Sequence, residues 1–437
     1  MLVIANRITA IARLVGLKPG EFYPVAWSFI YFFSLLSAYY MLRSVRDAMA
    51  IMGGTQNIPW LFTGTFVVMI LATPVFGWIA SRYPRKKFLP WVYYFFIFNI
   101  LIFFSLFTYV LRNDLETVWI ARAFFVWLSV FNLFVVSVFW SFMADIYSKE
   151  QGRRLFGVIS AGGSAGALLG PLMTSVLVVP LGFQNLLPLS AGLLMFSVYC
   201  VAQLRRWAER GTSEGREVVV DTSKPIGGGV LAGVRLVLTS PYLAAIALGG
   251  VFASFMGTAT YIYMAQLVSE NFATTDEQTQ VFAMLDALTN ALSLIGQLII
   301  VKQVVQRFGV GVSLAVLPLV SVIGFALLAV NPVFIVIAAL QVIRRSLTFG
   351  LGKPTSDMLY SVVSPEEKYK AKNFTETALY RGGDLVGAWA VRMMAGLGLS
   401  GISLVCVPIA AIWTATALWL GRDYKRRDKA ISAEQEV

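Results

Sequence analysis

Long apolar stretches, separated by short polar segments, run through the whole of this 437-residue sequence. A helix needs about 20 apolar residues to cross a bilayer. Only helices or closed barrels satisfy the backbone in lipid, and these stretches are too long and too apolar for barrel strands. The pattern predicts twelve transmembrane helices, near residues 22–47, 57–81, 88–111, 116–144, 154–180, 183–204, 240–268, 278–305, 311–330, 333–356, 373–397 and 400–421.

Lysine and arginine lie almost entirely on one side of these predicted spans. If the N-terminus is inside, the inner segments hold 26 of the 35 Lys and Arg residues, whereas the outer loops hold only Arg112. Basic cytoplasmic loops are typical of membrane proteins. The distribution predicts that both termini are cytoplasmic. It also accounts for most of the net charge of +12, so no nucleic-acid partner is expected.

The longest polar stretch divides the spans into six and six. Residues 208–235 are charged, rich in glycine and without periodicity, so we interpret them as a cytoplasmic linker. A short surface helix is expected at its end, from Val230 to Leu238. The prediction is an all-α polytopic membrane protein with two pseudo-symmetric six-helix bundles, an N-terminal bundle over 1–207 and a C-terminal bundle over 236–437.

Charged residues recur at the predicted inner ends of helices in both halves. The carboxylates are Asp145 after span four and Asp357 after span ten. The basic residues are Arg82, Arg85, Arg153, Arg154 and Lys353. Repeated six-helix halves are typical of secondary transporters. We predict a cytoplasmic gate in which these ion pairs hold the inner ends together. Lys353 and Asp357 are four residues apart, so a local pair is also expected.

Ionisable residues inside the spans are costly and face a cavity or a partner. Eight are basic and five are acidic: Arg43, Arg46, Arg122, Arg344, Arg345, Lys353, Arg381 and Arg392, against Asp47, Asp286, Asp357, Glu376 and Asp384. The positive surplus favours an anionic solute. The sequence contains no histidine, so proton coupling would have to use carboxylates, and no cofactor or metal is expected.

Span one carries the strongest candidate for contact with an anion. Arg43 and Asp47 are four residues apart and are expected to pair, which leaves Arg46 for the solute. The alternative is a structural ion pair at the outer rim. Asp286 in span eight has no base within four residues. We expect it to be protonated or to pair with an arginine in the other half.

The remaining charged candidates leave alternatives open. Arg122 would contact the solute or pair with another helix. Arg344 and Arg345 point about 100° apart on a helix, so one would face the cavity and the other a helix interface. Arg381 and Asp384 are three residues apart and can pair, either for structure or for binding.

Aromatic and small residues complete the candidate site. A stacking role is open for Tyr39, Tyr40, Trp127 and Trp140, although such rings more often pack in the core or lie at membrane interfaces. Four glycines of span five are expected to permit close helix packing rather than phosphate binding. They are Gly162, Gly163, Gly166 and Gly170.

Two motifs resemble those of the major facilitator superfamily. The segment from Gly77 to Lys86 is similar to its basic loop motif, with Ser81 where Asp is usual and Pro84 where Gly is usual. Because Ser81 replaces an acid, Asp145 and Asp357 are expected to carry more of the gate. Part of span five resembles the glycine signature of the superfamily's antiporters, with Thr174 and Ser175 at the trailing glycine positions; it comprises Gly157, Gly166, Gly170 and Pro171.

A narrower resemblance is to the ATP/ADP translocase family of nucleotide transporters. It rests on Leu42 to Asp47, Phe139 to Phe142, Arg153 to Gly157 and Lys353 to Asp384. The family usually has Lys where Arg46 stands. It also has an acidic residue early in span four, where this chain has Leu128, Ser129 and Val130. The resemblance implies a nucleotide-like solute and a contact at Arg46.

These observations predict a secondary transporter that moves an anionic, phosphorylated or nucleotide-like solute by alternating access, as an antiporter. Two alternatives remain: a proton-coupled symporter or exporter of a nonnucleotide solute, and a transport-inactive receptor or assembly factor on the same fold. An enzyme is not expected, because histidine and paired carboxylates are lacking. We expect a monomer in a bacterial inner membrane, with a small anionic solute and lipid as partners.

Overall fold

The computed structural model describes residues 18, 20–82, 85–213 and 230–435, and its regular structure over these ranges is helical. The helices group into two compact units. The N-terminal unit comprises Met1–Met52, Val67–Ser223 and Thr274–Ala287, and the C-terminal unit comprises Gly53–Phe66, Lys224–Ala273 and Leu288–Val437. Helices α3 and α10 are therefore each divided between the two units.

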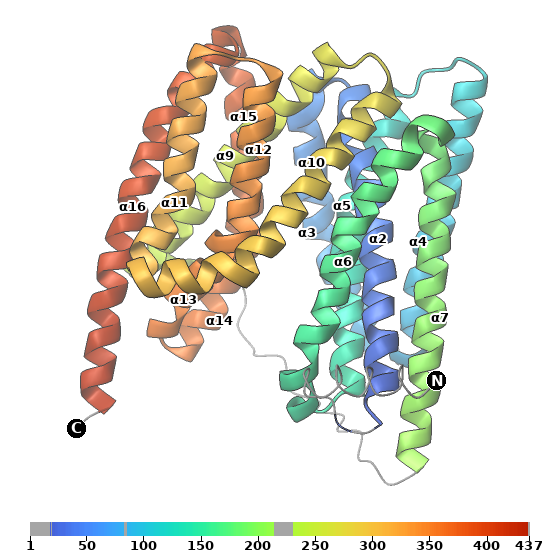
Figure 1. The fold of residues 1–437 in the computed structure, drawn as a ribbon, viewed down its shortest axis with the longest axis horizontal. Coiled ribbons are helices and arrows are strands. Elements are labelled where there is room, and N and C mark those ends of the chain that lie inside the picture. The colour runs from blue at the N-terminus through green and yellow to red at the C-terminus, as the bar shows by residue number, and fades with distance from the viewer. Residues whose placement is uncertain (1–17, 19, 83–84, 214–229, 436–437) are drawn as a thin grey trace, which may run out of the picture. The chain divides into compact units, whose positions relative to one another are not determined.

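The N-terminal unit is built mainly from five long helices (Figure 1). They are α2 (Phe22–Met52), α4 (Arg85–Arg112), α5 (Val118–Ile146), α6 (Lys149–Leu181) and α7 (Leu186–Ser213), with the short η2 (Phe183–Asn185) before α7. The unit also contains the second part of α3 (Ile58–Arg82) and the first part of α10 (Thr275–Ile295). The carboxylate of Asp276, in α10, accepts a 2.7 Å hydrogen bond from the backbone N–H of Phe183.

The C-terminal unit combines three long helices with several short, interrupted ones. Its elements are η1 (Thr55–Asn57), α8 (Val230–Thr239), α9 (Pro241–Asn271), η3 (Gly296–Ile300), α11 (Val301–Val330), α12 (Phe334–Leu347), η4 (Thr348–Gly352), α13 (Lys353–Met358), η5 (Leu359–Val362), α14 (Pro365–Phe374), η6 (Thr375–Leu379), α15 (Tyr380–Met393), η7 (Ala395–Leu397) and α16 (Gly398–Gln435). The first part of α3 belongs to it as well, and the indole N–H of Trp389 in α15 donates to Thr63 of α3 at 3.1 Å.

Within the described ranges, eleven helices are long and apolar enough to cross a membrane, so the protein is a multi-pass membrane protein. The span expected near 373–397 is the exception. It is divided between η6 and the 14-residue α15, which is shorter than the roughly 20 residues of a full span. Glu376, Arg381 and Asp384 also lower the apolar character of this segment.

The segment interpreted as a linker is described at its two ends. Helix α7 continues to Ser213, beyond the expected start of the linker at 208. Helix α8 confirms the short helix expected from Val230. Residues 214–229 lie outside the described residues, and the division of the chain at 208–235 stays a prediction.

Helices α2 and α6 of the N-terminal unit pack at very short distance. A Cβ atom at Gly162 would lie 2.4 Å from the carbonyl oxygen of Phe29, and one at Gly166 would lie 2.3 Å from the carbonyl oxygen of Phe33. Any side chain there would overlap the α2 backbone. The expectation that the glycines of this helix serve close packing is confirmed, as is usual for small residues between membrane helices.

This contact gives a first prediction. Gly166→Ala is expected to lower the free energy of unfolding by roughly 1–3 kcal/mol, because the added methyl group must push α2 away. Thermal unfolding of the purified protein measures the effect. The matched control is Gly157→Ala in the same helix, where a Cβ atom meets nothing within 4 Å. An equal loss in both variants would contradict the packing argument.

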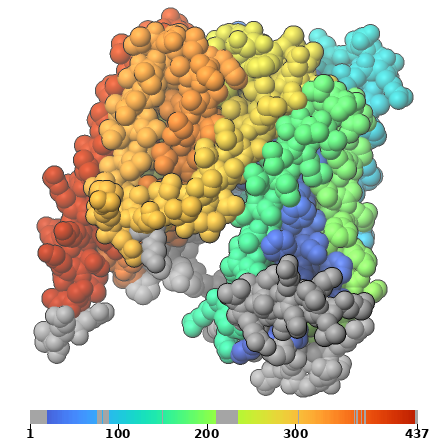
Figure 2. Space-filling model, in the orientation of Figure 1, coloured from blue at the N-terminus to red at the C-terminus, as the bar shows by residue number. Residues whose placement is uncertain are grey.

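Close glycine contacts and π-helical turns shape the C-terminal unit. Helices α11 and α16 run side by side, as the orange and red parts of Figure 2 show. Gly311 and Gly421 meet between them, and a Cβ atom on Gly311 would lie 2.9 Å from the Cα of Gly421. The segments η3, η4 and η6 are π-helical. Such turns are frequent at functional sites. Two of them directly adjoin charged segments, since η4 follows Arg344 and Arg345 and η6 precedes Arg381.

Candidate functional site

Two arginine–carboxylate pairs lie in the N-terminal unit, on α2 and on the first part of α10. The Nε atom of Arg43 is 3.6 Å from the carboxylate of Asp286. Arg46 donates two hydrogen bonds to Oδ1 of Asp47, 3.0 Å from Nε and 2.6 Å from Nη2. Asp286 and Asp47 are 1% and 3% exposed, so both carboxylates are removed from solvent.

The pairing differs from the one expected within α2. Arg43 was predicted to pair with Asp47, and this is wrong, because Asp47 is occupied by its neighbour Arg46. Arg43 instead extends over the ring of Tyr40, with 5.5 Å between the guanidinium carbon and the ring centre, and meets a carboxylate from another helix. The expectation that Asp286 pairs with an arginine from the other half of the sequence is confirmed.

The other candidates in this unit lie among aromatic rings. Tyr39 is 8% exposed and its ring contacts those of Tyr40 and Phe131. Trp127 and Trp140 pack in the same aromatic core, which is the more frequent of the two roles considered for them. Arg122 lies near the start of α5, with its guanidinium 4.7 Å from the ring of Trp119.

The most deeply buried arginine of the candidate set lies in the C-terminal unit. Arg344 on α12 is 5% exposed, and its Nη1 donates to the carbonyl oxygen of Ala253 on α9 at 3.3 Å. Its Nε atom is buried and makes no hydrogen bond. No carboxylate of the described ranges lies within 4 Å of this guanidinium. Gly257 makes room for it, because a Cβ atom at this position would lie 2.8 Å from Nη2.

A partly buried carboxylate lies on the neighbouring helix α15. Asp384 accepts hydrogen bonds from the hydroxyls of Ser254 at 2.5 Å and Thr258 at 3.2 Å, both on α9. Arg381 is 3.5 Å from the same carboxylate, which confirms the expected pair. Gly383 allows this approach, since its Cβ position is only 3.0 Å from the side chain of Ser254. Sequence reasoning missed both hydroxyl donors, which lie one turn apart on an otherwise apolar helix.

Arg344 and Arg345 differ in burial, as their positions on the helix require. Arg344 is buried against α9, whereas Arg345 is half-buried. Arg344 therefore lies against α9 with guanidinium donors that the Ala253 carbonyl does not use, and which of the two arginines faces a cavity stays a prediction.

A charge network joins α13, α14 and η6 at the other end of the same unit. Lys353 pairs with Asp357 at 3.0 Å and with Glu376, and Lys372 pairs with Asp357 at 2.9 Å. The expected Lys353–Asp357 pair is confirmed. These side chains are about one-third to one-half exposed, so each pair contributes little to stability by itself.

The residues predicted for the gate are described only in part. Arg154 binds Glu21, with 2.8 Å between Nη2 and Oε1. Arg82 and Arg153 are exposed, and Asp145 is half-buried. The side chain of Arg85 lies outside the described part of the chain. The gate stays a prediction. Glu21 was not predicted as the partner of Arg154, because it lies just ahead of the first expected span.

Glu21 gives a second prediction, on the pH dependence of stability. Burial by itself raises the pKa of this carboxyl, but hydrogen bonds from Arg154, the Lys18 backbone and Gln151 outweigh it and hold the pKa below its ordinary value of 4.5. A carboxyl with a lowered pKa in the folded state contributes stability above the ordinary pKa, and this contribution is lost as the pH falls through the lowered value. Glu21→Gln is therefore expected to flatten the loss of thermal stability on acidification.

The measurement is the unfolding temperature of the purified protein between about pH 6 and about pH 3.5. The control is Glu150→Gln, because Glu150 pairs with Lys18 at 3.2 Å with both side chains more than half exposed. Its variant is expected to follow the wild-type curve. A wild-type slope in Glu21→Gln would show that the Glu21–Arg154 pair does not contribute.

Apolar spanning helices in two units, with buried charged side chains in both, are typical of membrane transporters. The sequence profile of the Major Facilitator Superfamily matches residues 25–371, so the chain belongs to this family of transporters.

The individual relatives share only about one-fifth of their residues with this chain. The "ADP,ATP carrier protein 2" of Chlamydia pneumoniae is 21% identical to this chain, over 95% of this chain and 91% of the relative, and the protein of the same name in Chlamydia trachomatis is 20% identical. Among solved structures, a bacterial homologue of the iron transporter ferroportin superposes with a TM-score of 0.68 at 11% identity, covering 91% of this chain and 98% of the homologue. The nucleoside transporter NupG superposes with a TM-score of 0.61 at 12% identity, covering 92% and 99%. These structural likenesses show the fold.

Proposed function

We propose that this transporter moves an anionic, phosphorylated or nucleotide-like solute by alternating access, as an antiporter. The observation that carries the proposal is Arg344. A buried guanidinium whose one described hydrogen bond goes to a neutral carbonyl is costly unless an anion completes its environment. Its planar fork of donors suits a carboxylate or a phosphate. Charges buried in membrane helices most often mark a solute pathway.

The N-terminal unit supports the same class of solute. Arg43 and Arg46 each lie beside a carboxylate of the chain, and the Arg43–Asp286 separation of 3.6 Å is longer than a hydrogen bond. We infer that a solute anion exchanges with Asp286 at Arg43. The relatives named as ADP,ATP carriers favour a nucleotide within the class of anions.

Counterflow in proteoliposomes tests the proposal. Vesicles loaded with unlabelled ADP, ATP or a sugar phosphate are diluted into the corresponding labelled compound, and a neutral nucleoside serves as the matched control. Accelerated uptake of an anion but not of the nucleoside supports anion antiport. Uptake of the nucleoside alone would overturn the anionic class. Absence of flux for every compound, with a folded protein, would favour the transport-inactive receptor.

Asp384 favours a second candidate, a proton-coupled transporter. Its carboxylate is held by two hydroxyls and adjoins Arg381, in a helix that follows a π-helical turn. A carboxylate in this setting is suited to take up a proton when Arg381 turns away.

A third prediction separates the two candidates. If Asp384 is the coupling group, Asp384→Asn is expected to abolish uptake driven by a pH gradient while preserving counterflow, because the amide keeps the Ser254 and Thr258 contacts but cannot titrate. The measurement compares both modes in the same vesicles. Equal loss of both modes would place Asp384 in solute binding or in the fold, and not in coupling.

For localisation, we propose a bacterial inner membrane with both termini in the cytoplasm, from the basic residues that flank the spans on one side. Protease accessibility of tags at the two ends, in right-side-out and inverted vesicles, tests this orientation.

A further inference from the structure

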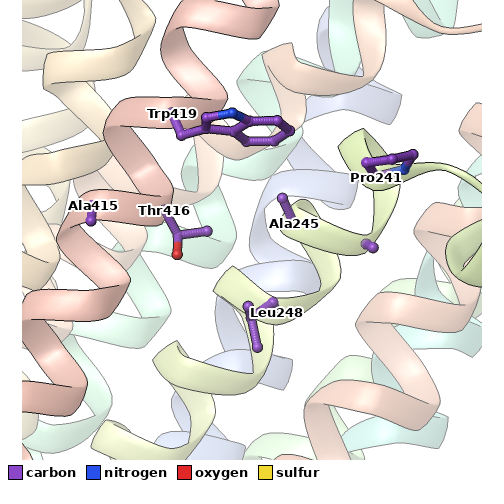
Figure 3. Close-up of a pocket in the computed structure, with 7 residues that line it drawn as sticks. Pro241, Ala245, Leu248, Ala415, Thr416 and Trp419 are labelled. Carbon is purple, nitrogen blue, oxygen red and sulfur yellow. The ribbon is translucent and has the colours of Figure 1, made fainter.

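An open groove of about 550 Å³ lies between α9 and α16 on the outside of the C-terminal unit (Figure 3). Its walls are almost wholly apolar. Helix α9 contributes Ala245 and Leu248, and α16 contributes Ala415 and Trp419. Thr416 is the polar side chain of the lining, and its hydroxyl already donates to the carbonyl of Ile412 at 2.9 Å. The indole N–H of Trp419 is the other polar group of the lining, and the remaining surface offered to an occupant is apolar.

The end of the groove at Trp419 lies at a depth that matches the edge of the hydrocarbon layer. Helix α16 begins at Gly398, and Trp419 lies about 30 Å further along at 1.5 Å per residue. This is the thickness of the hydrocarbon core. Trp419 is 44% exposed, and tryptophan is enriched where hydrocarbon meets headgroups. The part of the groove that extends from Trp419 toward Ala415 and Leu248 therefore lies at the depth of lipid acyl chains.

Basic residues continue the same stripe of α16 beyond Trp419. Arg422 and Arg426 follow Ala415 and Trp419 at helical spacings of three and four residues, so all four share one face. Arg422 is exposed, and Arg426 pairs with Asp423 at 2.8 Å while its side chain stays 81% exposed.

The neighbouring charges leave this patch positive. Asp423 is shared with Arg427, which lies 2.8 Å from it and over the ring of Tyr242. Lys429 continues the stripe further out, and Lys425 borders it, three residues from Arg422. Arg235 of α8 is also exposed, whereas Asp428 lies off the stripe. The two carboxylates of this region, Asp428 and the shared Asp423, are therefore outnumbered by the basic side chains around them.

We propose that this groove binds one acyl chain of an anionic phospholipid, whose phosphate lies beside Arg422 and Arg426. Along α16, the apolar walls come first, then Trp419, then the arginines. A bound lipid has the same order, with its acyl chain in the hydrocarbon layer, its glycerol region at the interface and its headgroup beyond. A basic cluster beside a membrane helix attracts anionic headgroups. This inference does not depend on which solute the protein carries.

Native mass spectrometry of the full-length protein tests the proposal, with phosphatidylglycerol and phosphatidylcholine of identical acyl chains as probes. The wild type is expected to retain one phosphatidylglycerol in preference to phosphatidylcholine. Arg422→Gln and Arg426→Gln are each expected to weaken this retention about fivefold. The matched control is Arg206→Gln, which removes an equal charge from an exposed residue of α7 in the N-terminal unit and is expected to retain the lipid.

The apolar wall is tested separately. Ala245→Trp fills the groove and is expected to abolish retention of the preferred phosphatidylglycerol without removing a charge. If this variant does not fold, Ala415→Phe fills the groove from the opposite wall. Equal retention of the two lipids by the wild type, an equal loss in Arg206→Gln and Arg422→Gln, or full retention with a filled groove would each overturn the proposal.

Discussion

Arg344→Gln is expected to lower solute uptake at least about 100-fold while the protein remains folded. The substitution removes the buried charge but keeps an amide that can reach the carbonyl of Ala253. Hydrogen bonds to a charged group contribute about 1.5–3 kcal/mol each, and a bidentate guanidinium makes two of them with a phosphate or carboxylate. Losing both corresponds to about 100-fold or more in uptake.

The measurement is initial counterflow of the solute identified in proteoliposomes, with folding checked by size-exclusion chromatography and thermal unfolding. Arg345→Gln is the neighbouring control, and a much smaller loss is expected because Arg345 is only half-buried. Gly257→Ala tests position without changing charge. Its methyl group would lie 2.8 Å from Nη2 of Arg344, so it is expected to displace the guanidinium and reduce uptake.

Two outcomes would remove Arg344 from the site. One is wild-type uptake by Arg344→Gln, which would make the guanidinium a packing element between α12 and α9. The other is an equal and mild loss in Arg344→Gln and Arg345→Gln, which would indicate a general effect of net charge. Either result would redirect attention to neutral or cationic solutes.

The fold of this protein follows from sequence to a large extent, because bilayer thickness imposes a strong length and composition signal. The eleven recognisable spans are of this kind. The segment around Arg381 is the instructive exception. It combines a π-helical turn with three charged residues, one of which is the Asp384 carboxylate of the candidate site, and these charges lower its hydropathy. The role of the α6 glycines could also be predicted, since the apolar sequence ahead of them predicts helices, whereas a phosphate-binding loop follows a strand.

Contacts between helices were harder to predict than pairs within one helix. Arg381 with Asp384 and Lys353 with Asp357 pair at local spacings, and both were foreseen. The same spacing rule failed for Arg43, because it ignores competing groups on other helices and at adjacent positions. The Glu21–Arg154 pair joins residues 133 positions apart, and no local pattern could have identified it.

Asp286→Asn is expected to destabilise the N-terminal unit by roughly 3–5 kcal/mol, because it leaves Arg43 as a buried charge without its carboxylate. Asp286 is 1% exposed, so water cannot replace the lost partner at that position. The double variant Arg43→Gln with Asp286→Asn is expected to recover most of this loss, since two neutral amides remain that can bond to each other. Thermal and denaturant unfolding of the single and double variants measures the coupling.

Transport by the same variants separates a structural pair from a binding pair. If Arg43 contacts the solute anion, the double variant is expected to fold well and yet to lose uptake, because the recovered stability does not restore the positive charge. Glu150→Gln, at the exposed Lys18 pair, is the control and is expected to change stability by less than about 1 kcal/mol. A double variant that is stable and fully active would make Arg43 and Asp286 a structural pair. Recovered stability with lost uptake would instead mean that Asp286 holds the arginine in place until the solute anion replaces it.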